Sequence, residues 1–397
     1  MSSDVADVRK KGVPAARLYR EGNALVFQYR QDYIDAGGAP VATTLPISSQ
    51  PLALPGGTSP AFFAGLLPEG RRLNAIRTRI KTSADNDLAL LLEIGQDLVG
   101  DVQVLAQDAD PDTSRDYLEI PNEVSRLDFN AIRDEYFGHR ASGLPGMQDK
   151  VSGKMMNART KTAEGDYLVK FNPDDVPFAV ENEAYFLALA KKCGIKVSKF
   201  TVLEDSRGVK ALRLERFDRP KNGNVSGRLA VEDGCQALNL YPADKYDLEF
   251  SLMAQKLISL CPGQAAAGFN LFKQLVFSWL SGNGDAHAKN FSVLESSLGD
   301  FAISPAYDLL CTAFYANDRT MSLTIDGKNT GWNRQTMIEA AKLLHVPEKL
   351  ANQVIDHQLK ILKAVPDALV DHALPFPSHL NYAVAKFLKK RLASLAE

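Results

Sequence analysis

The sequence predicts an α+β fold in which strands come early in the chain and helices late. Short strand-like runs, such as Ala16–Tyr19 and Ala24–Tyr29, recur within residues 1–108. A polar linker that contains proline follows at residues 109–115. From residue 232 onward, helical periodicity dominates. These observations predict three segments: a mixed α/β region at 1–108, a strand-rich lobe with one helix at 109–217, and a mainly helical lobe at 218–397.

Each segment has its own pattern of elements. In the first, a helical pattern runs from Ala61 to about Leu92. In the second, Asp166–Phe171 is a short apolar strand, and a helical run covers Ala184–Cys193. In the third, short strands are expected at Ile303 and at Leu323–Ile325. Its helices are expected at Leu248–Leu260, Ala265–Leu280, Gln335–Leu344, Lys349–Ala364 and Leu380–Leu395.

Composition restricts the class of protein more than its chemistry. The 397 residues are 45% hydrophobic and 24% charged, as in a globular protein with a large core. A net charge of −2 gives no general attraction to nucleic acid, and the basic run Arg71–Lys81 is either a DNA contact or a solvated helix face.

The four cysteines have no pairing pattern, so we expect them to be reduced. No leader or apolar span is evident, which predicts a cytoplasmic protein with no membrane partner.

The most informative residues are 281–290, which follow an apolar run and place Asp285 five positions before Asn290. Phosphotransferases of the protein-kinase type use Asp-x4-Asn. The aspartate accepts or orients the proton of the attacking hydroxyl, and the asparagine holds Mg²⁺. Asp308 follows 18 residues after Asn290 and supplies the second acidic group that a kinase metal site needs. We expect Asp285 to lie in an exposed loop.

Three further features support a kinase interpretation. The strand Asp166–Phe171 presents Lys170, as the phosphate-binding lysine strand of kinases does. Glu183, near the start of the helical run, is a candidate partner for Lys170, although a helix N-terminus favours carboxylates in any case. The turn Ser142–Val151 contains glycines whose backbone N–H groups are suited to cover phosphates. This order along the chain predicts a bilobal, protein-kinase-like fold.

The chain resembles the HipA family, the serine/threonine-kinase toxins of bacterial HipBA toxin–antitoxin pairs. Two motifs are similar to the family's catalytic loop and metal segment, Gly282–Asn290 and Pro305–Leu309. Two others are similar to its adenine hinge and glycine loop, Leu214–Arg219 and Gly146–Lys150. Near the N-terminus, two segments are similar to stretches specific to the family, Phe62–Gly70 and Glu93–Gly100.

This resemblance implies roles for individual residues. Asp285 is the expected catalytic base, and Asn290 and Asp308 are the expected Mg²⁺ ligands. The expected ATP-binding residues are Pro145, Gly146, Met147, Gln148, Asp149, Lys150, Lys170, Glu215, Arg216, Phe217, His287, Ala288, Lys289, Asn290, Tyr307 and Asp308. Within this set, Phe217 is the apolar contact for adenine and the hinge backbone makes the hydrogen bonds. His287 either contacts the nucleotide or bonds the loop backbone, and Lys289 either touches phosphate or faces solvent.

The chain departs from the family in three places. Ala230-Val231 stands where members often have His-Gln. Ser142 is the candidate for the family's autophosphorylated serine, but it lies one position further from the glycine loop, and Gly143 takes the expected place. No Asp-Phe-Gly is present, because Leu309 follows Asp308.

The resemblance implies the cofactors ATP and Mg²⁺ and three kinds of partner. The first is a HipB-like helix-turn-helix antitoxin, and the second is operator DNA bound through that complex. The third is a protein substrate such as an aminoacyl-tRNA synthetase, whose phosphorylation arrests growth. Two alternatives stay open: a small-molecule kinase of the aminoglycoside-phosphotransferase type, and an inactive regulatory subunit. The segment Leu66–Gly70 disfavours the first, and the intact set Lys170, Asp285, Asn290 and Asp308 disfavours the second.

Overall fold

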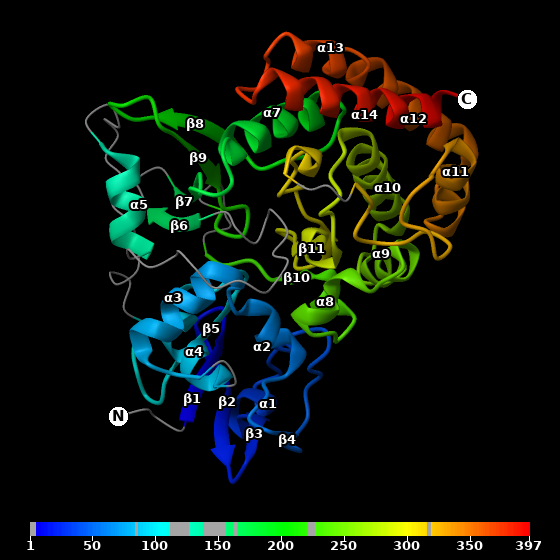
Figure 1. Ribbon diagram of the computed structural model, residues 1–397. Helices are drawn as coiled ribbons and strands as arrows, with labels where there is room; N and C mark the ends of the chain where they lie inside the picture. Colours follow the sequence, from blue (N-terminus) through cyan, green and yellow to red (C-terminus); the bar gives the residue numbers. More distant parts are fainter. Residues whose placement is uncertain are drawn as a thin grey trace.

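The computed structural model describes residues 5–83, 86–111, 127–137, 156–161, 165–220, 227–315 and 319–397. Three antiparallel sheets organise these residues, and each lies in a different part of the chain. In Figure 1 the blue N-terminal region lies below. The green sheet and the yellow-to-red helices lie above it.

The N-terminal region is a five-stranded sheet in the order β4-β3-β2-β1-β5. Every neighbouring pair is antiparallel, and β2 pairs with both β1 and β3. Among the described residues, the buried side chains that form its hydrophobic cluster all come from residues 6–104, so this region has its own core. The strands are β1 Val5–Lys10, β2 Val13–Glu21, β3 Ala24–Tyr29, β4 Leu52–Pro55 and β5 Val102–Ala106.

The helical pattern expected from Ala61 to about Leu92 is divided into three helices. The first ends at Leu66, since Leu67 precedes Pro68 and is therefore held out of the α conformation. The second ends at Lys81, whose φ of 53° is left-handed. With the short helix near Tyr33, the helices of this region are α1 Gln31–Asp35, α2 Ala61–Leu66, α3 Gly70–Ile80 and α4 Asp87–Ile94.

The second sheet has the order β6-β7-β9-β8 and carries the predicted lysine strand near its centre. This strand spans Asp166–Phe171, as predicted. The helix α7 covers Ala179–Lys192, a few residues longer at its start than the helical run expected from the sequence. The remaining elements are β6 Met156–Lys161, β8 Phe200–Glu204, β9 Lys210–Glu215 and α5 Phe129–Phe137.

The C-terminal part is mainly helical, with a small sheet in the order β10-β11-β12. The strands are β10 Val231–Asp233, β11 Ser292–Glu295 and β12 Phe301–Ile303. The strand expected at Leu323–Ile325 is absent from this described segment, where Thr324 and Ile325 form only isolated bridges. The helices are α8 Gly234–Ala237, α9 Phe250–Ser259, α10 Gln264–Ser281, α11 Arg334–Leu343, α12 Glu348–Leu362, α13 Val365–Val370 and α14 Ser378–Ala396.

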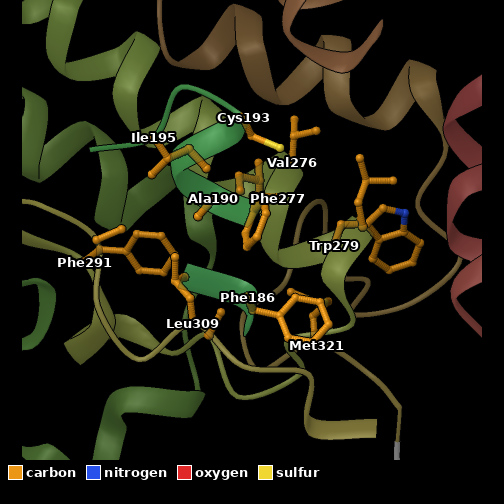
Figure 2. Packing of buried hydrophobic residues seen from close by; sticks show 14 of the residues in the cluster. Phe186, Ala190, Cys193, Ile195, Val276, Phe277, Trp279, Phe291, Leu309 and Met321 are labelled. Atoms are coloured by element: carbon orange, nitrogen blue, oxygen red, sulfur yellow. The ribbon is translucent and has the colours of Figure 1, made fainter. Parts of the chain in front are cut away.

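The largest core joins α7 to the C-terminal helices (Figure 2). Phe186 on α7 and Phe277 on α10 are fully buried within it. Trp279 lies in this core, and its ring stacks on that of Trp332 at 4.9 Å between centroids. Trp332 lies outside the helices and strands but is also buried. The helix that carries Glu183 is therefore anchored to the C-terminal helices.

All four cysteines are free and buried. Among the described residues, no helix is both long enough and apolar enough to cross a membrane.

We predict that Phe186→Ala lowers the free energy of unfolding by about 3–5 kcal/mol, because a fully buried ring is replaced by a cavity. Urea denaturation followed by tryptophan fluorescence measures the loss. Leu252→Ala is the matched control: Leu252 is 53% exposed, so its truncation should change stability by no more than about 0.5 kcal/mol. Similar losses in the two variants would contradict this account of the core.

Candidate active site

The catalytic-loop motif begins where α10 ends. Gly282 closes the helix in the left-handed conformation, with φ of 70°. A Cβ at Gly284 would lie 2.5 Å from the carbonyl oxygen of Thr320, so only glycine fits that position. Asp285 follows directly and is only 3% exposed. The expectation that Asp285 lies in an exposed loop is therefore wrong, because the neighbouring chain around Thr320 covers this turn.

Asn290 and Asp308, the two predicted metal ligands, are in contact. The Asn290 Oδ1 accepts a hydrogen bond from the backbone N–H of His287 at 3.0 Å. The amide nitrogen of Asn290 then faces Asp308 Oδ2 at 3.3 Å. This orientation of the amide follows from the hydrogen-bond pattern, since the His287 N–H needs an acceptor.

Lys170, from the strand-rich lobe, lies beside Asp308 and Glu183. Its Nζ lies 2.8 and 3.0 Å from the two carboxylate oxygens of Glu183, which confirms the predicted pair. The same ammonium also contacts Asp308 Oδ1. A strand, a helix and the metal-ligand segment therefore converge on one buried cation.

The backbone around Asp308 holds its carboxylate in this position. Asp308 has φ of 53°, a left-handed conformation that Asp and Asn adopt more readily than most residues. Asn283 donates a hydrogen bond from Nδ2 to the Asp308 carbonyl at 3.2 Å, and its Oδ1 accepts from the Asp285 N–H at 3.3 Å. Asn283 thus links the predicted base to the predicted metal aspartate.

Burial governs the electrostatics of this cluster. It raises the pKa of Glu183 to about 7, although the Lys170 ammonium acts in the opposite direction. Burial lowers the pKa of Lys170, but the carboxylates of Asp308 and Glu183 more than offset it and leave that pKa raised. Lys170 therefore stays charged between two carboxylates. The side chain of Asp308 is 25% exposed, so this carboxylate is the one open to a ligand.

Aromatic side chains surround the loop. The ring of Tyr307 lies 6.0 Å from that of Phe217, measured between centroids, and its hydroxyl donates to the Lys289 carbonyl at 2.6 Å. Burial raises the pKa of Tyr307, which keeps this hydroxyl protonated. His287 is buried, and its ring packs edge-on against Tyr246 at 5.2 Å between centroids.

Two other predicted nucleotide residues lie inside the loop. Ala288 is fully buried. The ammonium of Lys289 donates to Asp233 Oδ2 at 2.9 Å and to the Gly65 carbonyl at 2.8 Å, so it does not simply face solvent. Lys289 instead joins the catalytic loop to α2 of the N-terminal region.

The hinge residues Glu215, Arg216 and Phe217 lie at the end of β9. The backbone N–H groups of Glu215 and Arg216 donate to the carbonyls of Lys199 and Asp166, at 2.8 and 2.9 Å. Of the three hinge N–H groups, these two are therefore engaged within the sheet. The Arg216 side chain turns toward the N-terminal region, where its Nη1 lies 2.6 Å from Asp97 Oδ2.

Arg216 belongs to a buried set of four charges, which we call the hinge clamp: Asp97, Arg216, Asp218 and Arg219. Asp218 accepts two bonds from Arg216, at 3.1 and 2.9 Å, and one from Arg219 at 2.8 Å. Asp97 accepts a bond from Arg219 at 2.9 Å. All four side chains are at most 8% exposed.

Backbone groups complete the hinge clamp. The N–H of Gly100 donates to Asp218 Oδ2 at 2.9 Å, and the carbonyl of Leu98 accepts from Arg219 Nη2 at 2.7 Å. Burial raises the pKa of Asp218, but Arg216 and Arg219 more than offset it and lower this pKa to about 2. The clamp therefore pairs two buried cations with two buried anions, and each is hydrogen-bonded.

Sequence analysis missed the site residues whose role depends on tertiary contact. Asn182 is fully buried and bonds both the N–H and the carbonyl of Cys311 at 2.9 Å, which fixes α7 beside the metal segment. The sequence feature that could have indicated Asn182 is a polar residue on the apolar face of a predicted helix. The clamp partners Asp97, Asp218 and Arg219 lie inside two quoted motifs, but nothing in the sequence indicated that those motifs meet.

Other predicted residues and a separate cavity lie apart from this cluster. Ser142 and the glycine loop Pro145–Lys150 lie outside the described residues. A cavity of about 450 Å³ opens between α14 and the chain near Arg319 and Thr330, and it contains none of the predicted site residues. In the part of the chain that the structure describes, no three His, Cys, Asp or Glu side chains gather around a possible metal position.

Comparison with known proteins shows which proteins this chain is similar to. A family model described as the HipA-like C-terminal domain matches residues 142–367, and one described as the HipA N-terminal domain matches residues 6–105. The putative kinase Y4dM of Sinorhizobium fredii is 26% identical over 390 residues, which is 92% of this chain and 91% of that protein. The serine/threonine-protein kinase toxin HipA of Shewanella oneidensis is 26% identical over 382 residues, 88% of this chain and 84% of that protein.

A solved structure has the same fold. The matched chain comes from the Shewanella oneidensis complex of HipA, HipB and operator DNA, with a TM-score of 0.74 and 20% identity. The match covers 98% of this chain and 95% of that chain. The α+β, kinase-like architecture that the sequence predicted is confirmed.

The hinge clamp predicts a pH dependence of stability. Because the folded-state pKa of Asp218 lies near 2, below its ordinary value of 3.8, the unfolded chain binds this proton first as the pH falls. The stabilisation is present above about pH 4 and decreases as the pH falls toward 2. When the pH is lowered from about 5 to about 3, the free energy of unfolding decreases in both proteins. The decrease should be about 1 kcal/mol smaller in Asp218→Asn than in the wild type, because the variant has no carboxylate to protonate at this position. Urea denaturation at the two pH values measures this, and equal losses would contradict it.

Proposed function

This chain belongs to the HipA family, and on that premise we propose that it is an ATP-dependent serine/threonine protein kinase that acts as the toxin of a toxin–antitoxin pair. One observation carries the proposal: Lys170 lies between Glu183 and Asp308, and Asn290 is hydrogen-bonded to the same aspartate. A kinase needs this combination of a buried lysine, its helix carboxylate and two oxygen ligands for a metal.

The residues present suit Mg²⁺. Carboxylate and amide oxygens are ligands of this ion, which usually keeps several waters and binds through one or two carboxylates together with substrate phosphates. Asp308 and Asn290 would be the protein's share of the ligands, and the partial exposure of Asp308 leaves room for the rest. For Asn290 to take part, its amide must turn so that the oxygen, now bonded to the His287 N–H, faces Asp308.

The reaction would place different demands on each residue. Bound Mg²⁺ would supply charge neutralisation on the transferring phosphoryl group. Lys170 would exchange its contact with Asp308 for the nucleotide phosphates while Glu183 keeps it in place. Asp285 would accept or orient the proton of the substrate hydroxyl. Its burial restricts which groups can reach it.

The proposed partners follow from the relatives. A solved relative assembles with HipB and operator DNA, and we propose a HipB-like helix-turn-helix antitoxin and operator DNA for this chain as well. We further propose that the enzyme works in the cytoplasm, that its protein substrate is a translation component such as an aminoacyl-tRNA synthetase, and that this phosphorylation arrests growth. Ser142 remains the candidate for autophosphorylation.

We predict that Asp285→Asn reduces phosphoryl transfer by about 10²–10⁴-fold, because the general base is lost while the size of the side chain is kept. Transfer of label from γ-³²P-ATP to the protein itself and to a purified synthetase measures the effect. Circular dichroism and ATP affinity serve as controls and should be unchanged. A variant that retains full transfer would exclude Asp285 as the base, and label found on a small metabolite would favour the small-molecule alternative.

We predict that Asp308→Asn removes the Mg²⁺-dependent part of ATP binding, because the negative charge that would hold the metal is lost. Asparagine is the suitable replacement, since it tolerates the left-handed backbone at this position. Calorimetric titration of ATP with Mg²⁺ and with EDTA measures the difference. If Mg²⁺ increased ATP affinity equally in the wild type and the variant, the metal role of Asp308 would be excluded.

A further inference from the structure

Two motifs from distant parts of the sequence meet in the hinge clamp. Glu93–Gly100 contributes Asp97 together with the backbone of Leu98 and Gly100. Leu214–Arg219 contributes both arginines and Asp218. Arg216 is one of the expected ATP-binding residues, but no step of the proposed reaction uses the charged groups of the clamp. Arg216 and Asp218 are the neighbours of Phe217 in the sequence.

The position of Phe217 gives the clamp its significance. Arg216 precedes this residue and Asp218 follows it, and both side chains are held by groups of the N-terminal region. The Phe217 ring lies instead beside Tyr307, on the side of the catalytic loop. The short turn that presents the ring is therefore fixed at both ends by a domain outside the two lobes.

The contacts of the clamp hold the arginine side chains in a fixed orientation. A guanidinium group is planar and donates along fixed directions, so an arginine with two carboxylate partners is held in orientation as well as in position. Arg216 forms such contacts with Asp218 through two nitrogens and with Asp97 through a third. Without Asp97, two buried guanidinium groups would share one carboxylate, and their repulsion would act on this turn.

We propose that Asp97 is a positioning residue for the nucleotide. By holding Arg216 and Arg219, it keeps the hinge backbone and Phe217 in the conformation that receives the adenine base, so that the N-terminal domain sets the affinity for ATP. This inference rests on the proposed function. It also implies reciprocity: a partner that shifts the N-terminal domain changes ATP affinity, and bound ATP changes the affinity for that partner by the same factor.

The test uses the full-length chain and compares two clamp variants with a matched control. Asp97→Asn removes the charge, and Arg219→Lys keeps a charge but loses the planar fork that reaches both Asp97 and Asp218. Lys11→Gln is the control, because Lys11 also joins the N-terminal domain to the C-terminal lobe, through Glu295 at 2.5 Å, but makes no contact with the hinge clamp. Calorimetry gives the dissociation constant for ATP with Mg²⁺, steady-state kinetics give KM and kcat, and thermal unfolding gives Tm.

We expect both clamp variants to raise the dissociation constant and KM for ATP about tenfold, with kcat at saturating ATP close to that of the wild type. Lys11→Gln should leave all three quantities unchanged. Clamp variants with a lowered Tm but wild-type ATP affinity would overturn the inference and leave the clamp with a purely structural role. A wild-type chain that bound no ATP would instead overturn the proposed function, and this inference with it.

A milder variant keeps the test decisive if Asp97→Asn does not fold. Arg228 lies at the edge of the clamp, with Nη1 3.4 Å from Asp97 Oδ1 and a side chain that is 20% exposed. Arg228→Met removes one of the groups that orient the Asp97 carboxylate, so Asp97 should hold Arg216 and Arg219 less firmly although both stay paired. A smaller rise in the ATP dissociation constant, with an unchanged kcat, supports the inference, and an affinity equal to that of the wild type overturns it.

Discussion

The contact of one buried ammonium with two carboxylates holds the lobes together at the site. Lys170 comes from the central part of the four-stranded sheet, Glu183 from α7, and Asp308 from the turn after β12. Removing three charges from water is costly, and the structure supports that arrangement from several sides. The core around Phe186 anchors α7, Asn182 bonds the chain at Cys311, and Asn283 holds the carbonyl of Asp308. The Asp308 carboxylate is the part of this cluster that a ligand can reach, because its side chain is 25% exposed.

The N-terminal domain supports the site from a second direction. It contacts the hinge through Asp97 and the catalytic loop through Gly65, whose carbonyl accepts from Lys289. A Cβ at Gly65 would lie 2.7 Å from the side chain of Gln236, so glycine allows α2 to approach the C-terminal lobe this closely. The N-terminal domain therefore contacts both ends of the proposed nucleotide site, near the adenine and near the phosphates. It supplies none of the predicted ligands itself.

The sequence predicted what local pattern determines. The strand that carries Lys170 was located to the residue, because an apolar run bounded by polar residues specifies it. The long helices of the C-terminal lobe were found within one or two residues at most ends. The helical pattern expected over residues 61–92 is confirmed, but it is divided into three helices, because Pro68 and the left-handed Lys81 interrupt it.

Tertiary contacts account for most of what could not be predicted. The burial of Asp285 depends on a segment some 35 residues later that closes over the turn. The contact of Lys289 with Gly65 and that of Arg216 with Asp97 both depend on how the N-terminal domain packs against the lobes. The pattern of apolar residues along the sequence does not indicate that packing. A charged residue within a motif gives no indication of whether it will meet substrate, solvent or another domain.

The separate core of the N-terminal domain has a consequence for biogenesis. Because the described residues of its buried core all lie within positions 6–104, we expect this domain to fold on the ribosome before the two lobes are made. Asp97 is then already in place when Arg216 and Arg219 emerge from the exit tunnel. The domain that supports the site would therefore form before the lobes that it supports.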